Sequence, residues 1–253
     1  GHCWRFAAAR GSGSRFFFMT ANVGPDSAAQ VLRSANSEDW TTVLEFPVSG
    51  DAVGLAVDPV DPATLYAAQD GGQIFKTLDS GDTWEPTAGQ PGANTFTFAL
   101  AVDDEGRVFA GTRSGGLWRS TDGGESWQPA LTQQGTIWDC VVAGGAVYAS
   151  AGDANLYRST DGGDTWQALT AFESVDDGDE VGDQGAAIGV DPSDPDHILF
   201  SRRDPWHVVD DGPGVVESFD GGESWELRNE GLGMLNVSSF AFGSDGTVFA
   251  GTW

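Results

Sequence analysis

The sequence is poor in positive charge. It has 12 basic residues against 38 acidic ones, a formal net charge of −26, and its single lysine is Lys76. A field of this sign repels nucleic acid and anionic membranes, so we expect neither as a partner. Self-repulsion also weakens a compact fold in dilute buffer, whereas at molar salt the Debye length falls to about 3 Å. The composition therefore favours a salt-loving host, with an acidic surface for cationic ligands as the alternative.

Cysteine, histidine and long apolar runs are also scarce. The two cysteines, Cys3 and Cys140, are too few and too far apart for a disulfide framework, and Cys140 lies in an apolar run typical of the core. The three histidines are scattered without metal-ligand spacing. The apolar stretch at 16–19 is strand-sized, far short of the roughly 18 residues of a membrane span. We therefore expect no membrane span and no cofactor, apart from the calcium alternative below.

The location of the protein stays open. No positively charged segment followed by an apolar stretch marks a secretory signal, but the sequence does not begin with Met and is compatible with a leader removed from its start. Two locations fit this composition: outside the cell or at its surface, or the cytoplasm of a halophile that accumulates salt.

An octet of the pattern Ser/Thr-x-Asp-x-Gly-x-Ser/Thr-Trp recurs along the chain. It reads TLDSGDTW at 77–84, STDGGESW at 120–127, STDGGDTW at 159–166 and SFDGGESW at 218–225. A shortened copy, SANSEDW, occupies 34–40. The closing tryptophans recur about every 40 residues, with a longer last interval, which is the period of architectures built from one small unit per repeat.

The same strand pattern surrounds each octet. An apolar strand is followed by a turn rich in Asp, Pro and Gly (such as DPSDPD at 191–196), a second strand, a third that runs into the octet and a fourth that leaves it. First strands are predicted at 53–57, 96–102, 137–142, 186–190 and 237–242, and second strands at 65–68, 108–111, 147–150, 198–201 and 248–251. Four short antiparallel strands at this period indicate a propeller blade. We expect the first strand to be innermost and the later strands to alternate between buried and exposed residues.

The octet itself is predicted to be a folding device. Its hydroxyl and carboxylate can accept backbone N–H groups across the turn, its glycine supplies a positive φ angle, and its tryptophan packs against a neighbouring strand or blade. One carboxylate per blade is more than a single active site needs. The structural positions are Thr77, Asp79, Gly81, Trp84, Ser120, Asp122, Gly124, Trp127, Ser159, Asp161, Gly163, Trp166, Ser218, Asp220, Gly222 and Trp225.

These octets and their strands resemble the BNR/Asp-box repeat of sialidases, sortilin-type receptors, two-propeller xyloglucanases and the photosystem II assembly factor of chloroplasts and cyanobacteria. The resemblance runs from about Trp4 to the end of the chain. It implies an all-β β-propeller but no particular activity. It also implies that the octet turns share one face and that ligands meet the opposite face.

One β-propeller domain is therefore expected over 1–253. Its blades are predicted at about 1–46, 51–87, 96–130, 137–169 and 186–228, with a half blade at 237–253. Strands of the first blade are expected at 4–9, 16–21, 30–34 and 40–46. Two interpretations stay open. The chain is a piece of a ring of six or seven blades, which we favour because the first blade looks complete, or its last strands complete a closed five-bladed ring.

The segment SRRDPWHVVDDGPG at 201–214 is the most unusual part of the predicted ligand face. It brings Arg202, Arg203, Asp204, Trp206 and His207 together in a chain nearly free of basic groups. Arginine pairs bind carboxylates or phosphates, and tryptophan stacks on sugars or on a partner's apolar surface. The alternative is that the arginines pair with neighbouring carboxylates and that the tryptophan caps the insertion.

An acidic loop at 173–185 is the second unusual segment. Its carboxylates are hard oxygen ligands of the kind that Ca²⁺ prefers, but EF-hand spacing is absent and we favour a solvated loop. The calcium candidates are Asp176, Asp177, Asp179 and Asp183, with Glu180 beside them.

Three further candidates lie elsewhere on the predicted loop face. Trp138 and Asp139 open the inner strand of the fourth blade and are expected near the central channel, with core packing favoured for Trp138. Arg113 lies in the loop between the second and third strands of the third blade.

The resemblance sets out what an enzyme of this kind would need. A sialidase needs three arginines, a tyrosine nucleophile with a glutamate, and an acid/base aspartate; xyloglucanase chemistry needs two carboxylates in a cleft between two propellers. The tyrosines Tyr66, Tyr148 and Tyr157 occupy repeated strand positions, as do Arg119 and Arg158. We therefore predict a non-catalytic scaffold that binds a protein or glycan partner on its loop face. The alternative is a glycoside hydrolase-like propeller domain of the sialidase or xyloglucanase type.

Overall fold

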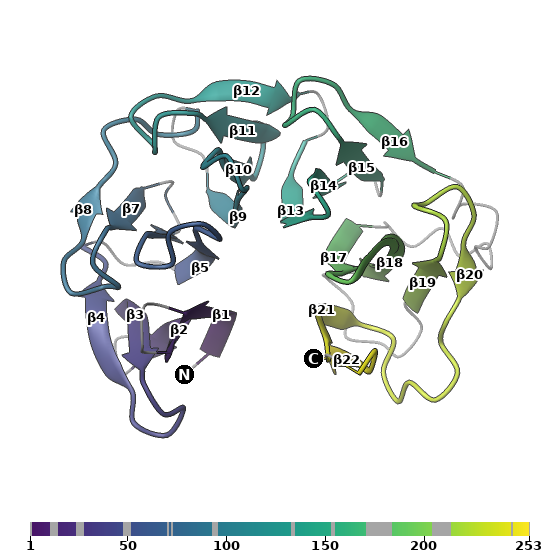
Figure 1. The fold of residues 1–253 in the computed structure, drawn as a ribbon, viewed down its shortest axis with the longest axis horizontal. Helices are drawn as coiled ribbons and strands as arrows, with labels where there is room; N and C mark the ends of the chain where they lie inside the picture. Colours follow the sequence, from purple (N-terminus) through teal and green to yellow (C-terminus); the bar gives the residue numbers. More distant parts are fainter. Residues whose placement is uncertain are drawn as a thin grey trace. The chain divides into compact units, whose positions relative to one another are not determined.

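A computed structural model describes the fold of residues 2–10, 15–23, 28–47, 52–69, 71, 73–92, 96–132, 135–152, 155–170, 184–203, 214–243 and 245–252. These residues form strands and turns only. The strands make five four-stranded antiparallel sheets and one two-stranded sheet (Figure 1). In every sheet, strands that follow one another in the chain are neighbours, as the blade pattern predicts.

The six sheets take their strands in chain order. Sheet A contains β1 (His2–Arg10), β2 (Arg15–Val23), β3 (Ala28–Ser34) and β4 (Thr41–Glu45). Sheet B contains β5 (Ala52–Val57), β6 (Leu65–Gln69), β7 (Ile74–Thr77) and β8 (Glu85–Pro86). Sheet C contains β9 (Thr97–Val102), β10 (Val108–Thr112), β11 (Leu117–Ser120) and β12 (Gln128–Leu131). Sheet D contains β13 (Ile137–Ala143), β14 (Ala146–Ala151), β15 (Leu156–Ser159) and β16 (Gln167–Leu169). Sheet E contains β17 (Gln184–Asp191), β18 (Asp194–Arg203), β19 (Gly214–Ser218) and β20 (Glu226–Leu227), and sheet F contains β21 (Val237–Phe242) and β22 (Val248–Thr252).

The predicted turn at 191–196 is shorter in the structure. β17 continues to Asp191, β18 begins at Asp194, and these two residues pair across the hairpin. The carboxylate of Asp191 accepts hydrogen bonds from the backbone N–H (2.8 Å) and the hydroxyl (2.7 Å) of Ser193. This local closure leaves only Pro192 and Ser193 between the strands, so the prediction of a six-residue turn is wrong here.

The chain divides into two compact units. Gly1–Thr132 holds sheets A, B and C, and Gln133–Trp253 holds sheets D, E and F. The expectation of one domain over 1–253 stays a prediction.

In the first unit the sheets pack face to face. Phe18 and Val31 of sheet A meet Leu65 and Phe75 of sheet B in one buried cluster. A second cluster joins sheet B to sheet C through side chains that include Tyr66, Ile74, Leu100 and Val108. Gly54 permits a close approach, because a Cβ atom there would lie 3.1 Å from Leu100 Cγ. The inner strands of sheets B and C are therefore in contact at a position where the strand of sheet B has a glycine.

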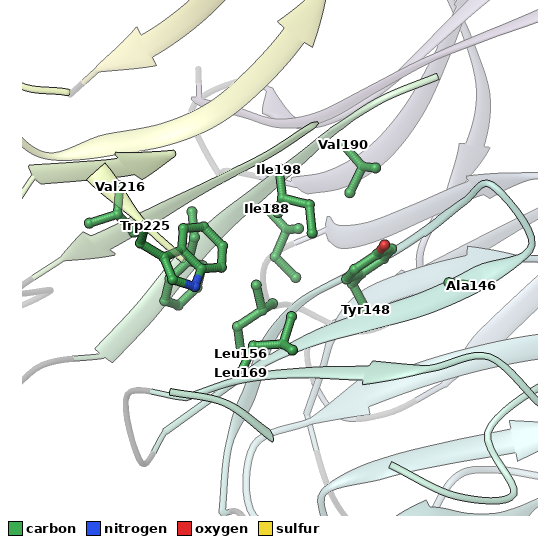
Figure 2. Close-up of a cluster of buried hydrophobic side chains, with 10 residues drawn as sticks. Ala146, Tyr148, Leu156, Leu169, Ile188, Val190, Ile198, Val216 and Trp225 are labelled. Carbon is green, nitrogen blue, oxygen red and sulfur yellow. The ribbon is translucent and has the colours of Figure 1, made fainter. Parts of the chain in front are cut away.

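The second unit repeats this packing. Figure 2 shows Tyr148, Leu156 and Leu169 of sheet D against Ile188, Ile198 and Val216 of sheet E, with the Trp225 ring inserted among them. Leu199 and Val215 of sheet E also pack on Val237 of sheet F. A Cβ at Gly189 would lie 2.7 Å from Phe240 Cβ, so a glycine again permits close approach between inner strands.

The second strand of a sheet is more buried than the sequence predicts. Every residue of β6, β10 and β14 is buried, whereas an alternating strand was expected. The faces of these strands are covered by neighbouring sheets. In β6, Leu65 packs with sheet A and Tyr66 packs with sheet C, so neither face is left to solvent. Exposure begins at the outermost strands, since both residues of β8 and both of β20 are exposed.

All six sheets share an irregularity where the first strand begins and the second ends. The pairing of these strands shifts register there in each sheet, which is the mark of a β-bulge. In three sheets a hydroxyl accepts a first-strand N–H at the shift. The bonds run from Arg5 N to Thr20 Oγ1 (3.1 Å), from Asp139 N to Ser150 Oγ (3.0 Å) and from Ala187 N to Ser201 Oγ (2.9 Å).

Candidate binding face

Each sheet has two chemically different ends. In sheets A to E the third strand runs into the octet, so the octet turns lie at one end, which we call the box end. Because the strands are antiparallel, the second strand ends and the first begins at the other end, which we call the loop end. The repeated bulges therefore lie at the loop end of each sheet.

At the box end the octet is built as predicted. In sheet C, Ser120 Oγ donates to Asp122 Oδ1 (2.8 Å) and accepts the N–H of Gly124 (2.8 Å). Asp122 accepts the N–H of Ser126 (2.9 Å) and its hydroxyl (2.5 Å). The same four bonds recur in the octets that start at Thr77, Ser159 and Ser218. The octet carboxylates are thus hydrogen-bond acceptors that hold a turn.

The charge state of the octet carboxylates follows from these bonds. The hydroxyl of Ser126 lowers the pKa of Asp122 most, followed by the N–H of Ser126 and the hydroxyl of Ser120, and the pKa falls from 3.8 to about 2. Matching bonds lower the pKa of Asp79 and of Asp220 to about 2 and lower that of Asp161 as well. Groups of this kind are poor proton donors at neutral pH.

The octet glycine adopts the positive φ that the sequence predicts, with 94° at Gly124. The preceding residue also has a positive φ, 72° at Gly123, which the sequence analysis did not predict. In the sheet B octet that preceding residue is Ser80, with φ 59°. Non-glycine residues pay for this left-handed conformation in steric strain, so Ser80 is an exception among its counterparts.

The octet also joins its sheet to the preceding one. Trp225 is only 6% exposed and lies in the cluster between sheets D and E. A Cβ at Gly222 would lie 2.7 Å from Leu169 Cδ1, and one at Gly124 would lie 2.6 Å from Thr87 Cγ2. The octet glycines therefore permit contact with the outer strand region of the preceding sheet. Trp84, Trp127 and Trp225 pack in the apolar clusters between sheets.

A basic residue just before the octet reaches the next octet along the chain. Arg33 Nη1 donates to Ser80 O (2.7 Å) and to Asp82 Oδ1 (2.7 Å). Arg158 Nη1 is 3.4 Å from Gly221 O, and its guanidinium lies over the Tyr148 ring. These contacts give the repeat arginines a role between sheets.

The tyrosines lie in the core, as the sequence indicates. Tyr66, Tyr148 and Tyr157 are all buried. Burial raises the pKa of Tyr66 to about 12, with the nearby charge of Asp58 adding to the effect, and burial also raises the pKa of Tyr148. A tyrosine nucleophile needs a proton that leaves easily, so this environment opposes that role.

At the loop end of the second unit, Asp139 is buried and committed to backbone groups. It is 7% exposed. Its Oδ1 accepts the N–H of Cys140 (3.0 Å), and its Oδ2 accepts the N–H of Ile188 (3.1 Å) in the neighbouring sheet. Trp138 is half-buried beside it. Asp139 therefore joins the inner strands of sheets D and E at their bulges.

The arginine-rich segment begins at the same end of the neighbouring sheet. Arg202 and Arg203 are the last two residues of β18. Arg202 pairs with Gly185 on one side and Gly214 on the other, and Arg203 pairs with Gln184. The hydroxyl of Ser201, just before them, accepts a hydrogen bond from the backbone N–H of Ala187. The structure thus places Arg202, Arg203 and Asp139 at the loop end of adjacent sheets. The other candidates of this segment, Asp204, Trp206 and His207, lie outside the described residues.

Arg113 lies at the loop end of sheet C, in the first unit. Its side chain is exposed, and its guanidinium carbon is 5.2 Å from the centre of the Phe96 ring. The backbone N–H of Arg113 donates to the backbone carbonyl of Phe96 (2.9 Å). The positive charge of Arg113 therefore lies beside an aromatic ring at the surface of sheet C.

The calcium candidates belong to the acidic loop at 173–185. Asp176, Asp177, Asp179, Glu180 and Asp183 all lie outside the described residues. Elsewhere, in the ranges that the structure describes, no three His, Cys, Asp or Glu side chains gather as metal ligands would. Nor does the described part of the chain contain a helix long and apolar enough to cross a membrane.

A histidine cluster at sheet E was not predicted. His197 Nε2 is 2.8 Å from Glu217 Oε1, and His197 Nδ1 is 3.5 Å from Asp191 Oδ2. Arg228 Nε donates to the other oxygen of Glu217 (2.5 Å), and the imidazole stacks on Phe219. The sequence did hold a signal, because Glu217 stands where the other full octets are preceded by Lys76, Arg119 and Arg158.

Comparisons with known proteins agree with this geometry. The BNR/Asp-box repeat model matches residues 118–129 and 157–168, which are two of the octets with two residues on either side. No curated protein matches the chain in sequence.

Solved structures match over most of the chain. An ancestral GH74 enzyme matches with a TM-score of 0.73 and 15% identity, over 100% of this chain and 35% of its own. The GH74 xyloglucanase from Xanthomonas campestris matches with a TM-score of 0.67 and 22% identity, over 83% of this chain and 36% of its own. YCF48 bound to D1 peptide matches with a TM-score of 0.64 and 14% identity, over 96% of this chain and 74% of its own.

The chain therefore spans about a third of the length of these GH74 enzymes and about three quarters of that of YCF48. At such identities the likeness concerns the fold. Together with the octets, it makes the chain an all-β BNR/Asp-box repeat β-propeller that is similar to GH74 xyloglucanase and to YCF48.

Proposed function

We propose that the chain is a non-catalytic scaffold that binds an extended segment of a protein partner at the loop end of sheets D and E. The observation that carries this proposal is the direction in which the pKa values of its carboxyl groups are displaced. Within the described ranges, the carboxyl groups with a displaced pKa are all displaced downward: Asp79, Asp122, Asp161, Asp191, Asp220 and Asp245.

Glycoside hydrolysis needs the opposite arrangement. One of its two carboxyl groups must keep a proton near neutral pH, which requires a raised pKa. Asp139 is the buried carboxylate at the proposed face, and both of its oxygens already accept backbone N–H groups. A group held in this way stabilises the contact between the inner strands of sheets D and E.

The chemistry of the proposed partner follows from Arg202 and Arg203. They are two of the 12 basic residues in a chain of net charge −26, and they lie at the end of a second strand, not at the position before an octet that Lys76, Arg119 and Arg158 occupy. Adjacent arginines suit a carboxylate, such as an acidic side chain or a chain terminus. The peptide carried by YCF48, a protein of similar fold, supports a peptide rather than a sugar as the ligand.

The test is a screen followed by titration. A displayed peptide library and a glycan array are probed with the full chain in molar KCl, and the best ligand is titrated by calorimetry. We expect a peptide with an acidic residue, bound at least tenfold more weakly by Arg202→Ala/Arg203→Ala and by Trp206→Ala. Lys76→Ala removes a positive charge at the box end and serves as the matched control. Glycans as the best ligands, or unchanged affinity in both loop-end variants, would contradict the proposal.

A second candidate is a glycoside hydrolase-like domain, favoured by the match of the whole chain to an ancestral GH74 enzyme. Assays with xyloglucan oligosaccharides and sialosides at high salt separate the two candidates. Turnover that one carboxylate substitution abolishes would establish the enzyme and overturn the scaffold.

We also propose that the protein works at high salt. Its net charge of −26 supports this, because self-repulsion between surface carboxylates is screened only at high ionic strength. Refolding yield and unfolding free energy should rise steadily as KCl is raised towards molar concentration. Full stability in dilute buffer would exclude a salt requirement.

A further inference from the structure

The single lysine of the chain lies between two sheets without a carboxylate partner. Lys76 of sheet B is half-buried, and its ammonium is 5.4 Å from the centre of the Tyr66 ring. Across the described ranges, no carboxylate pairs with this ammonium and no acceptor takes its N–H groups. The chain has 38 acidic residues, and charges removed from water are generally paired or hydrogen-bonded. The environment of Lys76 is therefore an exception to both.

Two further hydrogen-bond donors lie beside this ammonium. A Cβ atom at Gly123, in the octet of sheet C, would lie 2.6 Å from Lys76 Nζ and 3.5 Å from the Tyr66 hydroxyl. The ammonium, the hydroxyl and the backbone N–H of Gly123 therefore lie around one position. In the part of the chain that the structure describes, neither the hydroxyl nor this N–H has an acceptor. Burial raises the pKa of Tyr66 to about 12, so its hydroxyl keeps its proton at neutral pH.

Between sheets D and E the protein supplies acceptors at the matching position. A Cβ atom at Gly221 would lie 3.0 Å from Arg158 Nη1 and 3.0 Å from Asp196 Oδ1. The backbone carbonyl of Asp196 accepts the N–H of Gly221 (3.0 Å). The Tyr148 hydroxyl donates to Pro195 O (3.4 Å). One aspartate thus brings a carboxylate close to the basic residue and a carbonyl to the octet N–H.

The copy between sheets A and B is also closed by groups of the protein. Arg33 Nη1 donates to Ser80 O and to Asp82 Oδ1, both at 2.7 Å. The N–H of Ser80 donates to Ala63 O (2.9 Å). Of these three copies, the one around Lys76 is therefore the exception.

A glycine in the β9–β10 hairpin explains this exception. Gly106 stands two residues before the second-strand residue that pairs with the start of the octet, which is the place of Ala63 in sheet B and of Asp196 in sheet E. A Cβ atom at Gly106 would meet nothing within 4 Å. The carboxylates of two other hairpin residues pair with Arg107. The hairpin of sheet C thus places no carboxylate where sheet E places that of Asp196.

We propose that Lys76, Tyr66 and Gly123 form a binding site for a carboxylate of a ligand. The carboxylate accepts hydrogen bonds from the ammonium and the hydroxyl, and an adjacent carbonyl of the ligand accepts the N–H of Gly123, in the manner of Asp196. An aspartate within a peptide has both groups, whereas a small free carboxylate has only the first. Lys76 and Gly123 are half-buried, so solvent reaches the site.

Charge and affinity set the conditions under which this site is filled. The net charge of −26 repels anions at a distance, but at molar salt this repulsion is screened beyond about 3 Å and the direct contacts decide. A single carboxylate held by three donors binds in the millimolar range. The site belongs to the first unit and shares no residue with the loop-end face proposed above. Since micromolar peptide does not fill it, Lys76 remains a valid control position for that face.

One resonance reports on the site directly. Lys76 is the only lysine, so the full chain labelled with ¹³C-lysine gives a single Cε signal that needs no assignment. Potassium acetate or N-acetylaspartate methylamide replaces KCl at constant molar ionic strength. We expect a saturable shift with both, and about fivefold tighter binding of the aspartate derivative because its carbonyl accepts the N–H of Gly123. No saturable shift, equal affinity for the two ligands, or tighter binding of inorganic phosphate would overturn the proposal.

Two tyrosines offer a matched pair of substitutions. Tyr66→Phe removes the hydroxyl and keeps the ring beneath the ammonium, and it should weaken binding of the aspartate derivative about fivefold. Tyr148→Phe makes the same change between sheets D and E, where the hydroxyl is bonded within the protein, and it should leave the affinity unchanged. Equal affinity in Tyr66→Phe and the unmodified chain would contradict the site.

The lysine itself is tested through stability. A ligand that binds only the folded chain raises the urea midpoint, so N-acetylaspartate methylamide should raise it in a chain with Lys76 but not in Lys76→Met. Both chains also carry Arg202→Ala and Arg203→Ala, so that the loop-end face does not contribute. Arg158→Met in the same background is the control and should keep the ligand-dependent rise. An equal rise in Lys76→Met would place the ligand elsewhere and overturn the proposal, while leaving the loop-end proposal untouched.

Discussion

Asn36 Nδ2 donates to Asp39 Oδ2 at 2.9 Å, in the shortened octet of sheet A. The matching bond of a full octet runs the other way, from the hydroxyl of Ser126 to Asp122 Oδ2 (2.5 Å). The backbone bond keeps its direction, since Asp39 N donates to Asn36 Oδ1 as Ser126 N donates to Asp122 Oδ1, both at 2.9 Å. The shortened copy thus keeps the turn with one residue fewer by exchanging donor and acceptor.

This exchange predicts a compensating pair of substitutions. Asn36→Asp alone puts two carboxylates in contact and removes the donor, so it should lower the unfolding free energy by about 1 kcal/mol. Asn36→Asp with Asp39→Ser restores the arrangement of the full octets and should recover most of that loss. Urea unfolding at fixed KCl measures both. Equal losses in the single and the double variant would show that the side-chain bond contributes nothing.

The octets show why the architecture could be predicted from sequence. Ser120, Asp122 and Gly124 are neighbours in the chain, and their bonds close within one turn, so the sequence itself contains both partners. Strand order follows because each octet joins two adjacent strands. The same reasoning predicted too much solvent exposure for β6, β10 and β14, which are fully buried. The burial of a second strand depends on packing against other sheets, whose residues are distant in sequence.

The candidate site was harder to predict for the same reason. Asp139 looked like a channel residue, and its role depends on Ile188 in another sheet. His197 lacked any local motif, and its carboxylate neighbours come from separate strands. A departure from the repeat, Glu217 in place of a basic residue, was the accessible clue. Differences between copies of a repeat therefore point to special positions better than the shared pattern does.

Ser80 offers a stabilising substitution. Its φ is 59°, while the matching Gly123, Gly162 and Gly221 have φ between 70° and 72°. Ser80→Gly removes the strain of a side chain in this region, and part of that gain is lost to the greater freedom of glycine in the unfolded chain. We expect a net rise in unfolding free energy of about 0.5 kcal/mol, seen as a higher urea midpoint with an unchanged slope.

The control for Ser80 is a glycine elsewhere on the same turn. Thr83→Gly changes an exposed residue that donates to Asp79 and has no positive φ, and it should destabilise the protein. A loss of stability in both variants would mean that Ser80 carries no strain. The bond from Arg33 to Ser80 O should persist in Ser80→Gly, because the acceptor is a backbone carbonyl.

Asp139 should matter for stability rather than for chemistry. Asp139→Asn keeps the shape but offers one acceptor oxygen in place of two, so the N–H of Cys140 or of Ile188 loses its partner. We expect a loss of about 2 kcal/mol in unfolding free energy and faster hydrogen exchange at Ile188. Asp104→Asn, in an exposed turn, is the matched control. Unchanged stability in Asp139→Asn would return this residue to the list of candidate ligand-binding groups.

The lowered pKa values of the octet aspartates predict how stability depends on pH. For Asp122 the value falls from 3.8 to about 2 on folding. The ionised group therefore stabilises the folded state above about pH 4, and this contribution disappears as the pH falls through the folded pKa. Asp122→Asn cannot take part in this titration. Its deficit in unfolding free energy relative to the unmodified chain should be constant from about pH 7 to 5 and should shrink between about pH 4 and 2. A deficit for Asp122→Asn that stays constant down to pH 2 would mean that its hydrogen bonds do not favour the charged carboxylate.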